Sequence, residues 1–149
     1  ALRRAAPGAL EAAGEAIRCV ATGDGGLFEA LDVALAKPGT ITLEAALHGC
    51  PMVVVGRVHP VTAWLARHSA RVGHVALPNL ILEEEIVPER LQAEATPDRI
   101  AEALEPLFEG PARARQLEGL ERVVARLGPP GAIARTAELV EEMLGSARA

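Results

Sequence analysis

Short apolar runs alternate with polar, glycine-containing stretches through the first half of this chain. The runs at 33–36 and 52–55 are too short for helices and are bounded by Pro and Gly, which is typical of buried strands. Residues 40–48, between them, have the length and the start signals of a helix. The same pattern predicts further strands at 17–21 and 72–77, and helices at 9–16, 27–31 and 60–71. Strands that alternate with helices indicate a parallel sheet.

From residue 88 onward the apolar positions follow helical spacing only. We predict a short helix at 88–92 and longer helices at 97–108, 112–127 and 132–144. The predicted fold is therefore α/β, a Rossmann-like parallel sheet with helices on both faces and a helical C-terminal segment. We interpret residues 1–149 as one partial domain, in which 97–149 is all helical.

The stretch from Lys37 to Glu44 is the strongest candidate for chemistry. It places a Pro-Gly turn and the hydroxyl of Thr40 between a strand and a helix, where backbone N–H groups can hold a phosphate. Glu44 follows Thr40 by about one helical turn and would reach a sugar hydroxyl. This pattern favours a nucleotide-sugar site, although Pro-Gly before Thr also begins ordinary helices.

Further segments follow in a characteristic order: the strand at 50–55, Arg57 and the helix after it, Pro78-Asn79, and 87–92 ending in Gln92. In this order and spacing the chain resembles the C-terminal half of the lipid-A-disaccharide synthase family, which are inverting glycosyltransferases of the GT-B type. The resemblance is densest from Asp32 to Gln92 and weak before Gly26.

The resemblance implies that this chain binds a UDP-activated acyl-glucosamine and that a lipid-linked monosaccharide phosphate is the acceptor. It assigns donor binding to Gly39, Thr40, Thr42, Glu44, Asn79 and Gln92. The catalytic base would come from an N-terminal acceptor half that this chain lacks, so no residue here is assigned to catalysis and the chain alone is expected to be inactive. A homodimer is compatible with the family.

Two departures from the family pattern leave alternatives open. The family has Ser where this chain has Pro38, and usually Tyr where it has Gly56. The Lys37-Pro38-Gly39 form is similar to the donor turn of diacylglycerol glucosyltransferases. Another GT-B enzyme of that type, a UDP-sugar 2-epimerase, and a non-catalytic nucleotide-sugar-binding module therefore stay under consideration.

Composition excludes several function classes. The net charge is −5 and aromatic residues make up 2% of the chain, which argues against nucleic-acid binding. Cys19 and Cys50 have no paired spacing, and the four histidines share no ligand pattern, so we expect buried thiols and no metal or other cofactor. With neither a signal peptide nor a transmembrane run in the sequence, we expect a cytoplasmic protein.

Charge is unevenly distributed along the chain. Residues 45–82 carry three arginines and no Asp or Glu. Such a stretch suits an anionic ligand or an anionic lipid surface, although buried strands also carry few charges. In the predicted helix at 60–71, Trp64, Arg67 and Arg71 lie within helical reach of one another, and packing of Trp64 in the core is the competing interpretation. Peripheral association with the inner face of a membrane is therefore one hypothesis for this stretch, and the alternative stays open.

Overall fold

The computed structural model describes residues 26–57 and 73–146 of the 149 in the sequence. The chain forms two units, residues 1–30 and 31–149. In the first unit the 3-10 turn η2 (Phe28–Ala30) confirms the helical turn predicted at 27–31. The elements predicted at 9–16, 17–21 and 60–71 lie outside the described residues.

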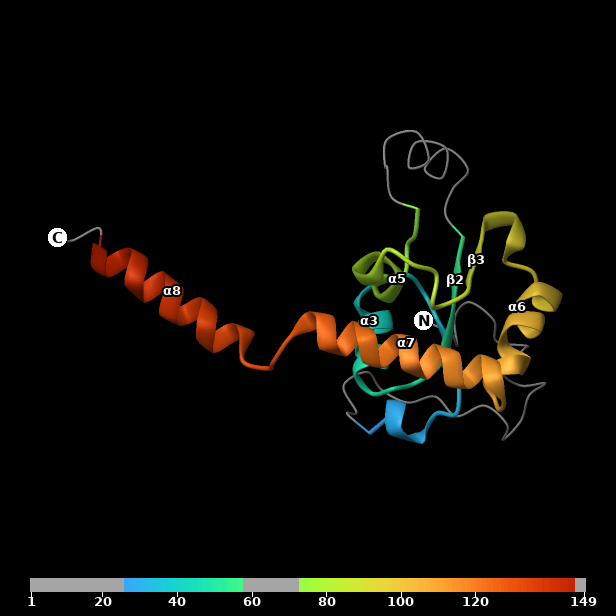
Figure 1. Ribbon diagram of the computed structural model, residues 1–149. Helices are drawn as coiled ribbons and strands as arrows, with labels where there is room; N and C mark the ends of the chain where they lie inside the picture. The colour runs from blue at the N-terminus through green and yellow to red at the C-terminus, as the bar shows by residue number, and fades with distance from the viewer. Residues whose placement is uncertain (1–25, 58–72, 147–149) are drawn as a thin grey trace. The chain divides into compact units, whose positions relative to one another are not determined.

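The second unit is built on a parallel three-stranded sheet. Strand β2 (Met52–Gly56) lies between β1 (Ala34–Ala36) and β3 (Glu89–Leu91), as Figure 1 shows. The register pairs β1 with the start of β2, from Ala34 opposite Met52, and β3 with its end, up to Leu91 opposite Gly56. The predicted strands at 33–36 and 52–55 are confirmed.

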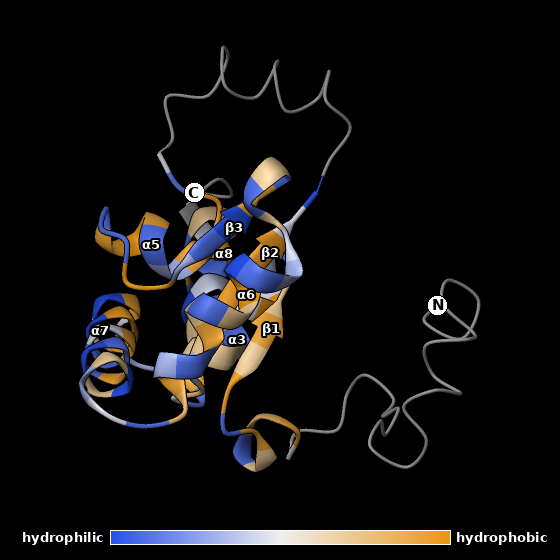
Figure 2. Cartoon of the chain, turned by 90° about the vertical axis from the view of Figure 1, so that its right-hand side faces the viewer, coloured by the Kyte–Doolittle hydropathy of each residue, from blue (hydrophilic) through white to orange (hydrophobic). Residues whose placement is uncertain are grey.

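Helices cover both faces of this sheet. The central strand is buried on both sides, since Met52, Val53 and Val54 have no exposed surface, and its apolar colour stands out in Figure 2. Val53 packs against Ala103 and Leu107. These two residues come from α6 (Pro97–Leu104) and the 3-10 turn η4 (Glu105–Leu107). Helix α3 (Thr40–Leu47) lies on the other face. The predicted α/β class is confirmed.

Helix α7 (Pro111–Leu127) ties together the amino ends of the strands. Its buried Gln116 accepts a hydrogen bond from Met52 N at 2.7 Å and donates to the carbonyls of Met52 and Ile86, both at 3.1 Å. Arg113 donates to the Asp32 carbonyl, which precedes β1, at 2.6 Å. All three strands are thus anchored, at or just before their first residues, to one helix.

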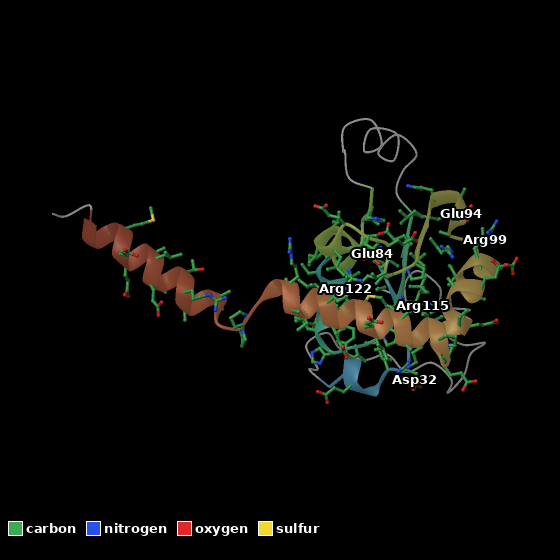
Figure 3. All side chains as sticks on the ribbon, viewed as in Figure 1. Asp32, Glu84, Glu94, Arg99, Arg115 and Arg122 are labelled. Carbon is green, nitrogen blue, oxygen red and sulfur yellow. The ribbon has the colours of Figure 1, made fainter. Side chains whose placement is uncertain are left out.

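Two further contacts place α7 against the segment that precedes β3. Arg122 pairs with Glu84 at 2.7 Å on the surface (Figure 3), and this pairing lowers the pKa of the Glu84 carboxyl. A side chain at Gly119 would come within 3.0 to 3.2 Å of Ile86, so glycine permits the close approach.

Helix α8 (Ala132–Ser146) confirms the helical C-terminal segment. It begins after Gly131, whose φ of +99° suits glycine, and Arg135 donates to the carbonyls of Pro129 and Pro130. Its large apolar side chains are exposed, namely Ile133, Leu139, Val140, Met143 and Leu144.

Two predicted elements are wrong. Residues 73–76, expected in a strand, form no ladder, and helix α5 (Leu77–Leu82) follows them with Pro78 in its first turn. The N–H groups of Val75 and Ala76 bond to a carboxylate instead of a neighbouring strand. The predicted helix at 88–92 is instead β3, because pairing with β2 overrides local propensity. Asn79 therefore lies inside a helix, not at a strand end.

Candidate functional site

The turn after β1 is centred on Gly39. Its φ of +145° and ψ of −171° fall in a region that only glycine adopts readily. Gly39 is the N-cap of α3 and supplies no side-chain cap, and both Gly39 and Thr40 are exposed. The first N–H groups of a helix have no partner within it. The positive end of α3 is therefore open to an anion at the carboxyl edge of the sheet.

The polar side chains of α3 have different surroundings. Thr40 and Glu44 are exposed and lie one helical turn apart, and their predicted contacts with a phosphate and a sugar hydroxyl stay predictions. Thr42 is buried: its hydroxyl donates to the Gly39 carbonyl at 2.8 Å and accepts from Leu77 N at 3.3 Å. Thr42 therefore shapes the turn from the inside and links it to the first turn of α5.

Two more residues reach the same edge from the other strands. Arg57 follows β2 and Gln92 follows β3, and the Arg57 Nε donates to the Gln92 carbonyl at 3.3 Å. Gln92 has a φ of +54°, which is uncommon for a residue other than glycine and is typical of constrained functional positions. The carboxyl ends of all three strands thus carry candidate ligand contacts.

Asn79 is fully buried and its amide is fully used. Its Oδ1 accepts from Ile86 N at 3.0 Å and Val87 N at 2.9 Å, while its Nδ2 donates to Val87 O at 2.8 Å and to Glu89 Oε1 at 2.9 Å. A ligand contact from this amide would have to replace one of these bonds. The geometry supports a structural role for Asn79, and direct donor binding by this residue stays a prediction.

The two departures from the family pattern meet in space. A Cβ atom at Gly56 would lie 3.2 Å from Pro38 Cγ and 3.2 Å from Leu91 Cδ2. A larger residue at position 56 would therefore press on the turn that precedes α3. The Pro38 ring occupies the space beside the end of β2, and it fits there because Gly56 has no side chain.

The Gly39 turn, Glu44 and Gln92 are all predicted site positions, and the structure brings them to one edge of the sheet. No role was predicted for Arg57, whose position directly after a buried strand was the available signal. Nor was one predicted for Glu89, which accepts hydrogen bonds from Val75, Ala76 and Asn79. A carboxylate with three such donors is invisible in the sequence, because its partners lie 10 to 14 residues away.

Other features of the described residues lie away from this edge. A groove of about 350 Å³ runs between α3 and α7, lined mainly by apolar side chains, but it borders the C-terminal end of α3. Cys50 is a free buried thiol, and burial raises its pKa, which makes it a poor nucleophile. Across 26–57 and 73–146, no helix is long and apolar enough to cross a membrane.

His, Cys, Asp and Glu side chains form no group of three that could hold a metal ion in the described parts of the chain. The expectation of a site without metal stays a prediction. The predicted surface helix with Trp64, Arg67 and Arg71, and the second cysteine Cys19, lie outside the described residues.

Comparison with known proteins gives one consistent result. The sequence model of the family described as lipid-A-disaccharide synthetase matches residues 22–142. The chain is 43% identical over 120 residues to the lipid-A-disaccharide synthase of Prochlorococcus marinus, covering 78% of this chain and 31% of that protein. It is 43% identical to that of Myxococcus xanthus, with 80% and 31% covered, and 41% to that of Nitrobacter winogradskyi, with 82% and 32% covered. The matched region spans about a third of these relatives.

Proposed function

The chain belongs to the lipid-A-disaccharide synthetase family of glycosyltransferases, and from this premise we propose that it is the donor-binding part of an inverting GT-B enzyme. The donor is a UDP-activated acyl-glucosamine, and the acceptor is a lipid-linked monosaccharide phosphate. The catalytic base comes from the part of the relatives' length that this chain does not cover. An anionic membrane surface, from which the acceptor is reached, and a second copy of the chain belong to the proposal as partners.

One observation carries the proposal: α3 begins, exposed and without a side-chain cap, at the carboxyl end of β1. In an open parallel sheet this is the edge at which nucleotides bind. The diphosphate would accept hydrogen bonds from the N–H groups of Thr40 and Ile41 and from the Thr40 hydroxyl. The exposed carboxylate of Glu44, one turn along, would accept from the ribose hydroxyls.

Sugar transfer leaves negative charge on the departing UDP, and this charge needs stabilisation in the transition state. The positive end of α3 supplies part of it. Arg57 is the cation that we assign to the rest, because it is exposed at the end of β2 and its Nε is already directed to the Gln92 carbonyl. The Gln92 side chain would contact the donor. The proposal includes no metal.

The first test is UDP binding to the complete natural protein. Replacing Glu44 by Ala should weaken binding by about 1 to 3 kcal/mol, because a hydrogen bond to a charged group is lost. Glu102→Ala is the matched control, since Glu102 is also exposed but lies on α6, across the sheet. Isothermal titration calorimetry with UDP measures both. If UDP binds the reference protein and Glu44→Ala with equal affinity, Glu44 does not bind the ribose.

The environment of Pro38 favours a second candidate, a GT-B enzyme with another UDP-sugar as donor. Pro38 stands where the family has a hydroxyl, and it lies against Gly56, the other departure. A panel of UDP-sugars, with and without an acyl chain, assayed on the complete protein separates the two. Preference for an unacylated UDP-hexose would favour the second candidate, and binding without turnover of any donor would indicate a non-catalytic module.

A further inference from the structure

Hydrogen bonds, joined through the backbone of residues 75–77, connect the Gly39 turn with the start of β3. The Gly39 carbonyl accepts from the Thr42 hydroxyl at 2.8 Å, and this hydroxyl accepts from Leu77 N at 3.3 Å. Just before Leu77, the N–H groups of Val75 and Ala76 donate to the Glu89 carboxylate at 2.9 to 3.1 Å. The first turn of α5 is therefore held between Thr42 and Glu89.

Asn79 closes this chain from the other side. Its Nδ2 donates to Glu89 Oε1, and its Oδ1 receives the N–H groups of Ile86 and Val87, which lead into β3. Thr42 and Asn79 have no exposed surface, and 9% of the Glu89 side chain is exposed. Among the described residues no buried side-chain nitrogen or oxygen lacks a partner. Buried networks in which every group is satisfied hold one arrangement and resist alternatives.

Glu89 accepts these hydrogen bonds and thereby links strand β3 to the segment that precedes α5. It lies on β3 opposite Val54, while the bonds it accepts fix a segment that in turn meets α3. Loss of its charge would release Val75 and Ala76, let the start of α5 move, and remove the donor that orients the Thr42 hydroxyl. The Thr42 hydroxyl, which donates to the Gly39 carbonyl at 2.8 Å, would then lose the second bond that fixes its orientation.

We propose that Glu89, acting through Thr42 and supported by Asn79, is a positioning residue that holds the Gly39 turn in its diphosphate-binding shape. This inference rests on the proposed function for its ligand, but the network can be measured without one. It also gives Asn79 its role through the network and not through contact with the donor sugar.

The test uses Glu89→Gln in the complete natural protein, with Glu85→Gln as the matched control, because Glu85 is an exposed carboxylate of the same connecting segment. Under conditions where both variants are fully folded, the dissociation constant for UDP should rise roughly threefold to thirtyfold in Glu89→Gln and stay unchanged in the control. Amide hydrogen exchange without UDP should accelerate at Thr42 and Leu77 but not in β2. In a background of Thr42→Val, Glu89→Gln should have little further effect on UDP binding.

The two readouts separate the possible failures. Faster exchange at Thr42 and Leu77 with no UDP binding by any form would support the network and contradict the proposed function. Unchanged exchange and unchanged UDP affinity in Glu89→Gln would overturn the network, as would a loss of affinity that only reflects unfolded protein. If Glu89→Gln does not fold, Thr42→Val and the conservative Thr42→Ser replace it: the proposal requires weaker UDP binding in the first and near-normal binding in the second.

Discussion

Gly56 and Pro38 show how neighbouring residues adjust to each other at the ligand edge. The space beside the end of β2 holds Pro38 and Leu91, so a methyl group on residue 56 would sit 3.2 Å from both. The Leu91 methyl group can rotate away, but the Pro38 ring is closed onto its own backbone and yields only if the turn shifts. The turn before α3 therefore depends on the absence of a side chain at position 56.

This contact yields a prediction for a double-mutant cycle. Gly56→Ala should lower the free energy of unfolding by about 1 to 2 kcal/mol through overpacking, and should weaken UDP binding because the Gly39 turn shifts. Pro38→Ser should relieve most of both effects in the double variant. Urea denaturation and calorimetry measure the cycle, with Gly73→Ala as a control because Gly73 lies outside the helices and strands and a side chain there meets nothing within 4 Å. Strictly additive effects of the two substitutions would show that the residues do not interact.

Individual site residues were predictable from the sequence only where the signal was local. Pro-Gly-Thr after an apolar run was enough to place the Gly39 turn and Glu44. The bond from Arg57 to the Gln92 carbonyl and the bond from Leu77 N to the Thr42 hydroxyl each join residues 35 positions apart. No local pattern encodes such partners.

At the scale of elements, α7 anchors the sheet through the side chain of Gln116. The Gln116 amide bonds to the N–H and carbonyl of Met52 at the start of β2, where a neighbouring strand would otherwise do so. It also donates to the carbonyl of Ile86, before β3. An apolar residue of the same size would leave the N–H and carbonyl of Met52 buried without partners. Such groups carry their full desolvation cost.

We therefore expect Gln116→Leu to lower the free energy of unfolding by about 2 to 4 kcal/mol. The effect should appear in the midpoint of urea denaturation with an unchanged slope. Arg115→Leu, at the neighbouring exposed position of α7 (Figure 3), should change stability by less than about 0.5 kcal/mol. If the two variants unfold at the same urea concentration, the bonds of Gln116 contribute nothing net.

Elements were predictable where length or apolar content was sufficient. The helices at 40–48, 97–108, 112–127 and 132–144 follow from spacing and caps, and the structure confirms them. Strand β3 has only three residues, two of them charged, so nothing but pairing with β2 identifies it. The apolar run at 75–77 imitates a strand, but Pro78 supplies a preformed first helical turn and Glu89 satisfies the N–H groups before it.

At the scale of the whole molecule, the chain covers about 31% of the relatives it matches. In the proposed GT-B reaction, donor and acceptor halves face each other, and all the contacts that we propose for the described residues are with the donor. Assignment of the family was possible from the order of motifs, whereas no motif among the described residues identifies the acceptor.

The corresponding prediction separates binding from turnover. This chain on its own should bind UDP, within about tenfold of the affinity of the complete protein, but should transfer no sugar to a lipid-linked acceptor. Calorimetry and a radiolabelled-donor assay on both forms provide the comparison, with the Glu44→Ala chain as the control for specific binding. Sugar transfer by the isolated chain would contradict the division of roles between the two halves.

The anchoring of the strands by α7 has a consequence for how this fold can change over time. Gln116 and Arg113 hold the strands at their amino ends. The turns at the carboxyl ends therefore contribute less to holding the sheet together. Under the proposed function, paired substitutions such as Pro38 and Gly56 would alter which nucleotide sugar is accepted, while the sheet stays the same. An architecture divided in this way would be evolvable, because new donor preferences would arise at one edge without a new fold.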